Sequence, residues 1–345
     1  MRIAQLVSNA YPVNSRSNQA IYSHVATLAN DMTRKGHEVD VFASADSCTQ
    51  ATLHAVEIAS SDLKSLPPDI QKYWLQALIA DCYTQAERFD VIHSHFTLLS
   101  SFYADLVSTP TLLSVHSPIR PEIRPFLEKY KHLSYVSFSH AQRLQMPELN
   151  WVATVYHGVD TKKFAFSPTS KEYFLYLGRV TEEKGVHYAI QAAKAAGACL
   201  LIAGRSYQAE GYWHRYIEPE INGVTVRYVG EADLEKKIEL LQGAKALLFP
   251  TQYDETFGLV MIEAMACGTP VIGWRSGAVP EVVAHGVSGF VVETVEEMVR
   301  AMRSIGTLRR EDARLRVERY FSQEKMCQGY ERVYQRIIQQ SASKS

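Results

Sequence analysis

Two glutamates, Glu255 and Glu263, lie eight positions apart in the segment Y-D-E-T-F-G-L-V-M-I-E-A-M-A-C-G-T-P-V, residues 253–271. Glu263 stands within an apolar run, where an unpaired buried carboxylate is costly. It therefore needs a partner, and two kinds fit: the hydroxyls of a ribose diol, or a cation elsewhere in the chain. At about 1.5 Å of rise per residue, the two carboxylates would be separated by roughly 7–10 Å along a helix axis, a span that suits hydroxyl groups flanking a diphosphate.

A helix is expected to start near Gly258, directly after this acidic loop. The first N–H groups of a helix have no partner within the helix, and they favour anions. We therefore predict that the backbone N–H groups of Phe257, Gly258 and Leu259 bind a phosphate.

A second cluster is G-R-V-T-E-E-K-G, residues 178–185, which follows an apolar strand pattern. With a helix expected to begin near Thr181, Lys184 would fall in its first turn, where an acidic residue is normally favoured. Two interpretations are open. Arg179 and Lys184 either bind a phosphate or diphosphate together with the helix start, or they are solvated surface charges that neighbouring glutamates offset.

Short β-branched runs alternate with longer helical patterns, and this alternation indicates a parallel, doubly wound α/β fold. In the first half the predicted strands cover 2–8, 38–44, 90–95, 110–116, 134–139 and 151–156. In the second half they cover 173–179, 199–204, 224–230, 246–250 and 270–274. Such sheets bind ligands beyond the carboxyl ends of their strands.

The polar stretch 160–171 interrupts the alternation of strand and helix patterns, and we interpret it as a linker. The sequence therefore predicts an N-terminal domain over 1–160 and a C-terminal domain over 161–324. A final helix is expected at about 325–341, because apolar residues recur there at helical spacing.

The composition excludes several classes of protein. A formal net charge of −1 argues against a general nucleic-acid binder. The five cysteines are scattered and form no C-x-x-C pair, which favours a reduced, cytoplasmic protein. No apolar run is long enough to span a membrane, and no signal-peptide pattern opens the sequence.

Together these motifs resemble the retaining glycosyltransferases of the GT-B fold, glycosyltransferase family 4. The likeness is strongest over 173–293, where the G-R-V-T-E-E-K-G and E-x7-E segments and S-G-A-V-P-E-V-V-A-H-G-V-S-G-F all match the family pattern. It implies two Rossmann-like domains that face a cleft, with the last helix crossing back to the N-terminal domain. The C-terminal domain would bind the nucleotide-sugar donor, and the N-terminal domain the acceptor.

The resemblance also assigns roles to residues. Glu255 would touch the hydroxyls of the donor sugar, Glu263 the nucleotide ribose, and Arg179 and Lys184 the donor diphosphate. His116 matches the histidine that approaches the donor sugar, so it and Glu255 are the expected catalytic residues.

The candidate acceptor-side residues are Arg16, Asn18, His95, Arg120 and Arg124. The three arginines either recognise an anionic acceptor together or are solvated loop charges, and His95 either lines the acceptor site or is structural. One departure from the family pattern stands at Gln19 and Ala20, which replace the usual Gly-Gly pair before the first long helix. Side chains there would crowd a close approach of the backbone to donor phosphates.

The expected reaction is metal-independent transfer of a hexosyl group, with retention, to a hydroxyl of a small-molecule or glycan acceptor. A UDP-sugar is the favoured donor and a GDP-sugar the second, and no cofactor is expected. Three alternatives stay open: a sugar-nucleotide epimerase, a phosphorylase on the same fold, and a sugar-nucleotide-binding protein without catalysis.

Overall fold

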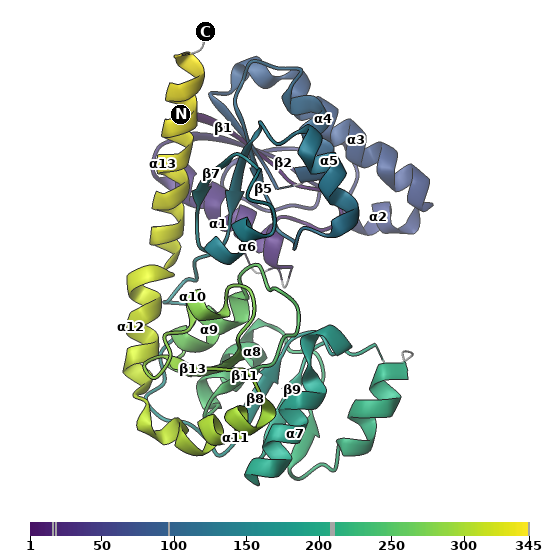
Figure 1. Ribbon diagram of the computed structural model, residues 1–345. Coiled ribbons are helices and arrows are strands. Elements are labelled where there is room, and N and C mark those ends of the chain that lie inside the picture. Colours follow the sequence, from purple (N-terminus) through teal and green to yellow (C-terminus); the bar gives the residue numbers. More distant parts are fainter. Residues whose placement is uncertain (16, 18, 96, 208–210, 344–345) are drawn as a thin grey trace. The chain divides into compact units, whose positions relative to one another are not determined.

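The computed structural model describes residues 1–15, 17, 19–95, 97–207 and 211–343. The chain forms two compact units (Figure 1). Unit 1 consists of Met1–Val155 with Met326–Ser345, and unit 2 consists of Tyr156–Lys325. The sequence placed the boundary between the domains slightly later, at residue 160.

Unit 1 contains a seven-stranded parallel sheet in the order β3-β2-β1-β4-β5-β6-β7. Its strands are β1 (Arg2–Leu6), β2 (Glu38–Phe42), β3 (Thr52–His54), β4 (Val91–Ser94), β5 (Thr111–Ser114), β6 (Ser134–Ser137) and β7 (Trp151–Thr154). Its helices are α1 (Ala20–Arg34), α2 (Ser60–Ser65), α3 (Pro68–Thr84), α4 (Thr97–Ala104), α5 (Arg124–Lys129), α6 (His140–Leu144) and most of α13 (Gln323–Ala342).

The predicted return of the last helix to the N-terminal domain is confirmed. Met326 and the residues after it belong to unit 1. Glu331 of α13 accepts a hydrogen bond from Lys35 at 3.1 Å and lies 3.2 Å from the ring of His37. The apolar positions of α13, among them Val333 and Ile337, are buried. This amphipathic helix therefore completes the core of unit 1.

Unit 2 contains a six-stranded parallel sheet in the order β10-β9-β8-β11-β12-β13. Its strands are β8 (Phe174–Leu177), β9 (Leu200–Ala203), β10 (Val226–Tyr228), β11 (Leu247–Phe249), β12 (Val271–Trp274) and β13 (Gly289–Val292). Its α-helices are α7 (Val186–Ala196), α8 (Leu234–Gly243), α9 (Leu259–Ala266), α10 (Val279–Val282), α11 (Val295–Ser304) and α12 (Arg310–Tyr320).

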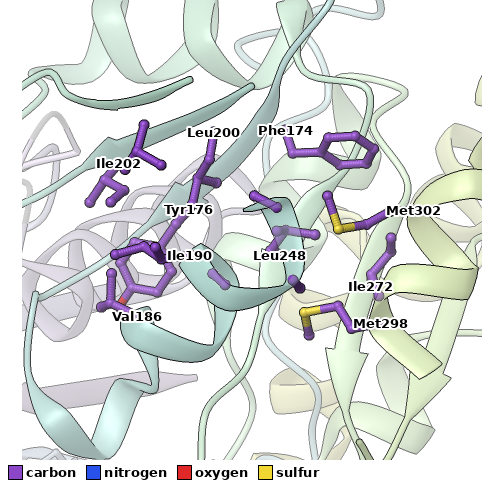
Figure 2. Packing of buried hydrophobic residues seen from close by; sticks show 14 of the residues in the cluster. Phe174, Tyr176, Val186, Ile190, Leu200, Ile202, Leu248, Ile272, Met298 and Met302 are labelled. Carbon is purple, nitrogen blue, oxygen red and sulfur yellow. The ribbon is translucent and has the colours of Figure 1, made fainter. Parts of the chain in front are cut away.

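The core of unit 2 lies between this sheet and two of its helices. Phe174 and Leu200 of neighbouring strands pack with Ile190 of α7 and Met302 of α11 (Figure 2). Helix α11 has a well-defined start, because the side chain of Thr294 caps it by accepting a hydrogen bond from a backbone N–H. Helices cover parallel strands on both faces, which is why the strand sequences are nearly continuous apolar runs.

Every strand that the sequence predicted is present, so the doubly wound α/β fold is confirmed. Two further strands, β3 and β13, were not predicted; β3 has three residues and lies at a sheet edge. Within the described part of the chain, no helix combines the length and the hydropathy that crossing a membrane requires.

Candidate functional site

The candidate site of unit 2 lies at the point where the strand order reverses. The chain builds outward from β8 in one direction and from β11 in the other. Ligands of doubly wound sheets bind beyond the carboxyl ends of the two strands at such a point. The loops that follow β8 and β11 contain the two motifs singled out from the sequence, residues 178–185 and 250–258.

Backbone hydrogen bonds fasten these two loops to each other. The backbone N–H of Gln252 donates to the carbonyl oxygen of Glu183 at 2.9 Å. The side chain of the same glutamine donates to the carbonyl oxygen of Glu182 at 3.0 Å. The two motifs therefore form one structural unit at the edge of the sheet.

Lys184 and Glu255 form an ion pair across this junction. Lys184 Nζ lies 2.6 Å from Glu255 Oε2, and the two side chains are only 15% and 13% exposed. Tyr253 joins the pair: its hydroxyl donates to Glu255 Oε2 at 2.8 Å and accepts a hydrogen bond from Lys184. Burial and the neighbouring Glu255 carboxylate raise the pKa of Tyr253 above its ordinary value. The phenol therefore stays protonated and serves as a donor.

The predicted helix around Lys184 is wrong in its position. Residues Glu182–Lys184 form one turn of 3-10 helix, and α7 begins only at Val186. Gly185 interrupts the helix with a φ of +69°. A Cβ on this glycine would lie 2.1 Å from the carbonyl oxygen of Pro250, so its missing side chain is what allows the two loops to approach. Lys184 therefore lies just before the N-cap of α7 and not in the first turn of that helix.

Helix α9 begins at Leu259, with Gly258 at its N-cap position, as the sequence predicted. Within the described residues no side chain caps this helix start, and its first turn contains no acidic residue. The side chain of Phe257 is buried against the rings of His157 and Phe321, at centroid distances of 5.2 and 5.8 Å. This anchor fixes the loop that leads into α9, whose first N–H groups remain the predicted phosphate site.

Glu263, in the middle of α9, has a cationic partner. Lys237 of α8 donates a hydrogen bond to Glu263 Oε1, and the two side chains are 24% and 14% exposed. The sequence left open whether the partner of Glu263 is a ribose diol or a cation, and the structure contains the cation, Lys237. Contact between Glu263 and a nucleotide ribose remains a prediction.

The loop after β12 also contacts the segment that carries Glu255 and holds the backbone of that residue. Ala278 donates its backbone N–H to the carbonyl oxygen of Glu255 at 3.0 Å, and Gly277 donates to Asp254 Oδ1 at 3.2 Å. A Cβ on Gly277 would lie 2.3 Å from that same carbonyl oxygen of Glu255. The segment S-G-A, residues 276–278, therefore sets the position of Glu255.

Arg179 lies on the surface, unlike Lys184. Its guanidinium is 3.2 Å from Glu183 Oε1, and both side chains are 53% exposed. An exposed pair of this kind contributes little to stability. Its partner is weakly held, so Arg179 could turn toward an anion at low cost.

Unit 1 contains a cluster of histidines at its own switch point, between β1 and β4. His116, two residues after β5, is partly buried, and its Nε2 lies 3.0 Å from Nδ1 of His95. His95 is 4% exposed and its Nε2 lies 2.9 Å from Gln5 Oε1. The ring of His24 on α1 lies 5.5 Å from that of His95 and 5.7 Å from that of His116.

This burial favours neutral imidazoles. It lowers the pKa of His24 to about 4. Burial, with the charge of the nearby His24 ring, also lowers the pKa of His116 well below its ordinary value. His116 is therefore uncharged at neutral pH and can either donate or accept a hydrogen bond through its ring nitrogens.

We expect unit 1 to lose stability on acidification through the His24 ring. Between pH 6.5 and about 4 the unfolded chain binds a proton at His24 that the folded chain does not, so the free energy of unfolding should fall by about 3 kcal/mol. The described rings that face His24 include those of His95, His116, Phe138 and Tyr330. Hydrogen exchange of the β1 and β4 amides against pH measures this. If His24→Phe shows the same fall as the wild type, His24 is not its source.

The candidate acceptor-side residues differ in their exposure and contacts. Arg16 and Asn18 lie outside the residues that the structure describes. Arg120 is exposed at the start of a short 3-10 turn. Arg124 is 44% exposed and donates to the backbone carbonyl of Gln145. His95 is too buried to offer much surface to an acceptor.

Gln19 and Ala20, which replace the Gly-Gly pair of the family pattern, lie at the start of a helix. Gln19 is the N-cap residue of α1, which begins at Ala20. Among the described residues, no group of three or more His, Cys, Asp or Glu side chains is arranged to hold a metal ion.

Sequence reasoning missed several residues of the site. Lys237 precedes the buried Leu240 and Leu241 by three and four positions, so it lies on the apolar face of α8. A lysine on such a face indicates an anionic partner, and the sequence could have shown this. Gln5 gave a similar signal, because it interrupts an apolar strand. Tyr253 and Gly277 act through contacts between separate loops, and nothing in their local sequence indicates that.

Two family models match the chain. Residues 22–163 match "Glycosyltransferase Family 4" and residues 160–320 match "Glycosyl transferases group 1". Among curated relatives, glycogen synthase of Mycobacterium tuberculosis is 32% identical over 46% of this chain and 41% of that protein. N-acetyl-alpha-D-glucosaminyl L-malate synthase of Bacillus anthracis is 25% identical over 90% of this chain and 92% of that one.

Solved structures share the fold over the whole chain. AviGT4, a glycosyltransferase involved in avilamycin A biosynthesis, matches with a TM-score of 0.71 at 22% identity, covering 98% of each chain. Anabaena Alr3699/HepE in complex with UDP-glucose matches with a TM-score of 0.71 at 16% identity, covering 99% of this chain and 100% of that one.

Proposed function

This chain belongs to the group 1 glycosyltransferases of family 4, and from that premise we propose that it transfers a hexosyl group from a nucleotide sugar to a hydroxyl acceptor. The observation that carries the proposal is the Lys184–Glu255 pair at the β8/β11 switch point, beside the start of α9. A cation and a helix start both suit the diphosphate of a donor, which is its leaving group, and a carboxylate suits its sugar hydroxyls.

In the proposed reaction the protein stabilises the charge that develops on the leaving diphosphate. Lys184 and Arg179 would neutralise it, with help from the backbone N–H groups at Gly258 and Leu259. This arrangement supports transfer without a metal ion. Glu255 would accept hydrogen bonds from the sugar hydroxyls. Retention at the anomeric carbon and the role of His116 near the donor sugar follow from the family resemblance.

Glu263 is proposed to bind the ribose of the donor. Its carboxylate has room for further hydrogen bonds, because the hydrogen bond from Lys237 uses only Oε1. A ribose diol could therefore donate to the carboxylate without displacing the lysine. A UDP-sugar is the proposed donor, with a GDP-sugar second. The structure of Anabaena Alr3699/HepE, which shares the fold, contains UDP-glucose and supports this order. The cytoplasmic location predicted from cysteine usage remains a prediction.

The first test is thermal stabilisation by UDP-, GDP- and ADP-sugars without added metal. At 100 times the dissociation constant a ligand adds about 2.7 kcal/mol, which raises Tm by roughly 5–10 °C for a domain of this size. We expect one nucleotide to give the larger shift, and Arg179→Ala and Glu263→Ala to weaken it. The control is Glu220→Ala, which removes a carboxylate that pairs with Lys194 on α7. No shift with any sugar nucleotide in folded protein would count against the proposal.

Product analysis then separates transfer from its rivals. Release of nucleoside diphosphate that depends on a hydroxyl acceptor supports a transferase. Release that depends on inorganic phosphate, with formation of a sugar 1-phosphate, indicates a phosphorylase. An epimeric sugar nucleotide, or a free epimerised sugar formed with water and released together with nucleoside diphosphate, indicates an epimerase. Binding without any turnover would leave the non-catalytic alternative.

A further inference from the structure

The central strands of unit 1 have an unusual polar face. Ala4 and Leu6 of β1 pack into an apolar cluster with α3, so Gln5 between them points to the opposite face of the sheet. His93 of β4 is the register partner of Gln5 on that face. Both side chains are fully buried, although parallel strands covered on both faces are normally apolar throughout. Buried polar groups need partners, and these two have them.

A continuous line of hydrogen bonds starts at the C-terminal helix and ends at His116. Gln5 donates from Nε2 to the hydroxyl of Tyr334 on α13 at 2.8 Å. Its other amide atom, Oε1, lies 2.9 Å from His95 Nε2. His95 Nδ1 in turn lies 3.0 Å from His116 Nε2. Every member of the line belongs to unit 1.

The direction of each bond in this line follows from Gln5. Its Oε1 can only accept, so His95 Nε2 carries a proton and donates. A neutral His95 then has a bare Nδ1, which can only accept. His116 must therefore carry its ring proton on Nε2 and donate it to His95. A glutamine on β1 thus selects the tautomer of a histidine beyond β5.

We propose that Gln5 and His95 are positioning residues that hold His116 in its Nε2–H tautomer and fix the orientation of its ring, with Tyr334 anchoring the amide of Gln5. The proposal rests on the proposed function for its catalytic consequence, since His116 is the residue expected to approach the donor sugar. It assigns His95 to the interior of unit 1 rather than to the acceptor.

His93 supplies a matched control for His95. The two histidines lie two positions apart on the same face of the same chain segment, and both are buried. His93 is bonded to Tyr334 through Nδ1 and to Ser114 through Nε2, each at 2.7 Å. His93 thus meets the line only at its anchor, Tyr334, and the bonds from Gln5 to His95 and from His95 to His116 do not involve it. Replacing either by phenylalanine removes one buried imidazole of the same cluster.

The first measurement is the tautomer of His116, read from long-range ¹H–¹⁵N correlations of the imidazole rings at neutral pH. The signal is assigned by its loss in His116→Gln. We expect Nε2 protonated and Nδ1 bare in the wild type and in His93→Phe. We expect a changed or averaged pattern in His95→Phe and Gln5→Leu. A wild-type His116 protonated at Nδ1, or a His95→Phe protein with an unchanged pattern, would overturn the proposal.

The second measurement is the turnover of the donor that the thermal panel identifies. We expect His95→Phe to lower kcat about tenfold or more with KM for the donor within about twofold, because orientation and not binding is lost. His93→Phe should keep kcat within about threefold. Equal losses in the two variants would mean a merely structural effect. If no donor is turned over by the wild type, the proposed function fails, while the ring spectrum still decides the tautomer.

Discussion

Replacing Lys184 with methionine is expected to lower kcat for glycosyl transfer about 10²- to 10³-fold, the loss typical of removing one preorganised group that stabilises developing charge. Methionine keeps the length and the apolar stem of the side chain and removes only the charge. Steady-state kinetics with the donor identified by thermal stabilisation measures the effect.

The same substitution is expected to destabilise unit 2. Removing one partner of a buried ion pair costs about 3–5 kcal/mol when the other charge is left without compensation. Glu255 keeps its hydrogen bond from Tyr253, and both members of the pair retain some exposure, so we expect about 2 kcal/mol. Urea unfolding of the variant and the wild type gives this value.

The Lys194–Glu220 pair is a control with the same separation of the charged atoms and a greater exposure to solvent. Lys194 Nζ lies 2.6 Å from Glu220 Oε2, the same separation as in the Lys184–Glu255 pair, but its side chain is 56% exposed. Lys194→Met should therefore cost less than about 1 kcal/mol and leave transfer unchanged. The double variant Lys184→Met/Glu255→Gln should regain stability without regaining activity. A Lys184→Met enzyme with nearly normal kcat would rule out the role assigned to this lysine.

The second large effect is expected from a single methyl group. Gly185→Ala places a Cβ where it would lie 2.1 Å from the carbonyl oxygen of Pro250, in addition to the strain of a left-handed backbone. We expect a loss of stability about 1–3 kcal/mol beyond that strain, as in other overpacked sites. We also expect weaker donor binding, because the loop that carries Glu255 must move.

Gly197 is the matched control for this substitution. Its backbone angles, φ 66° and ψ 31°, nearly equal those of Gly185, φ 69° and ψ 28°, yet a Cβ on Gly197 meets nothing within 4 Å. Gly197→Ala therefore measures the backbone strain alone. Urea midpoints and calorimetric donor affinities should separate the two variants. Indistinguishable values would mean that the contact with Pro250 does not hold the two loops together.

The strands of unit 2, and the loops that form its candidate site, could be predicted from the sequence, because both depend on local pattern. Apolar runs such as those of β8 and β11 mark buried parallel strands, and the unusual residues follow them directly. The start of α9 could also be predicted, since a glycine precedes an apolar helix of eight residues. These features need no knowledge of which segments meet.

The errors concern residues whose environment depends on the tertiary structure. The 3-10 turn ends at Gly185, which lies close to Pro250, and no helical propensity encodes that approach. The partner of Glu263 comes from a different helix, α8, so the sequence could state only that a partner was needed. The short edge strand β3 has too few residues to show any periodicity.

The ion pairs of unit 2 have a consequence for selectivity. Because Lys184 is already neutralised by Glu255, an anion that takes the lysine leaves a partly buried carboxylate with one donor fewer. Inorganic pyrophosphate brings no sugar hydroxyls, and its remaining negative charges repel the Glu255 carboxylate, so it compensates the loss of the lysine poorly. A nucleotide sugar brings the anion together with hydroxyl donors, and it can satisfy both residues at once. If Lys184 and Glu255 bind the donor as proposed, the pair would favour ligands that combine an anion with hydroxyl donors over the simple polyphosphates that a lone lysine would bind.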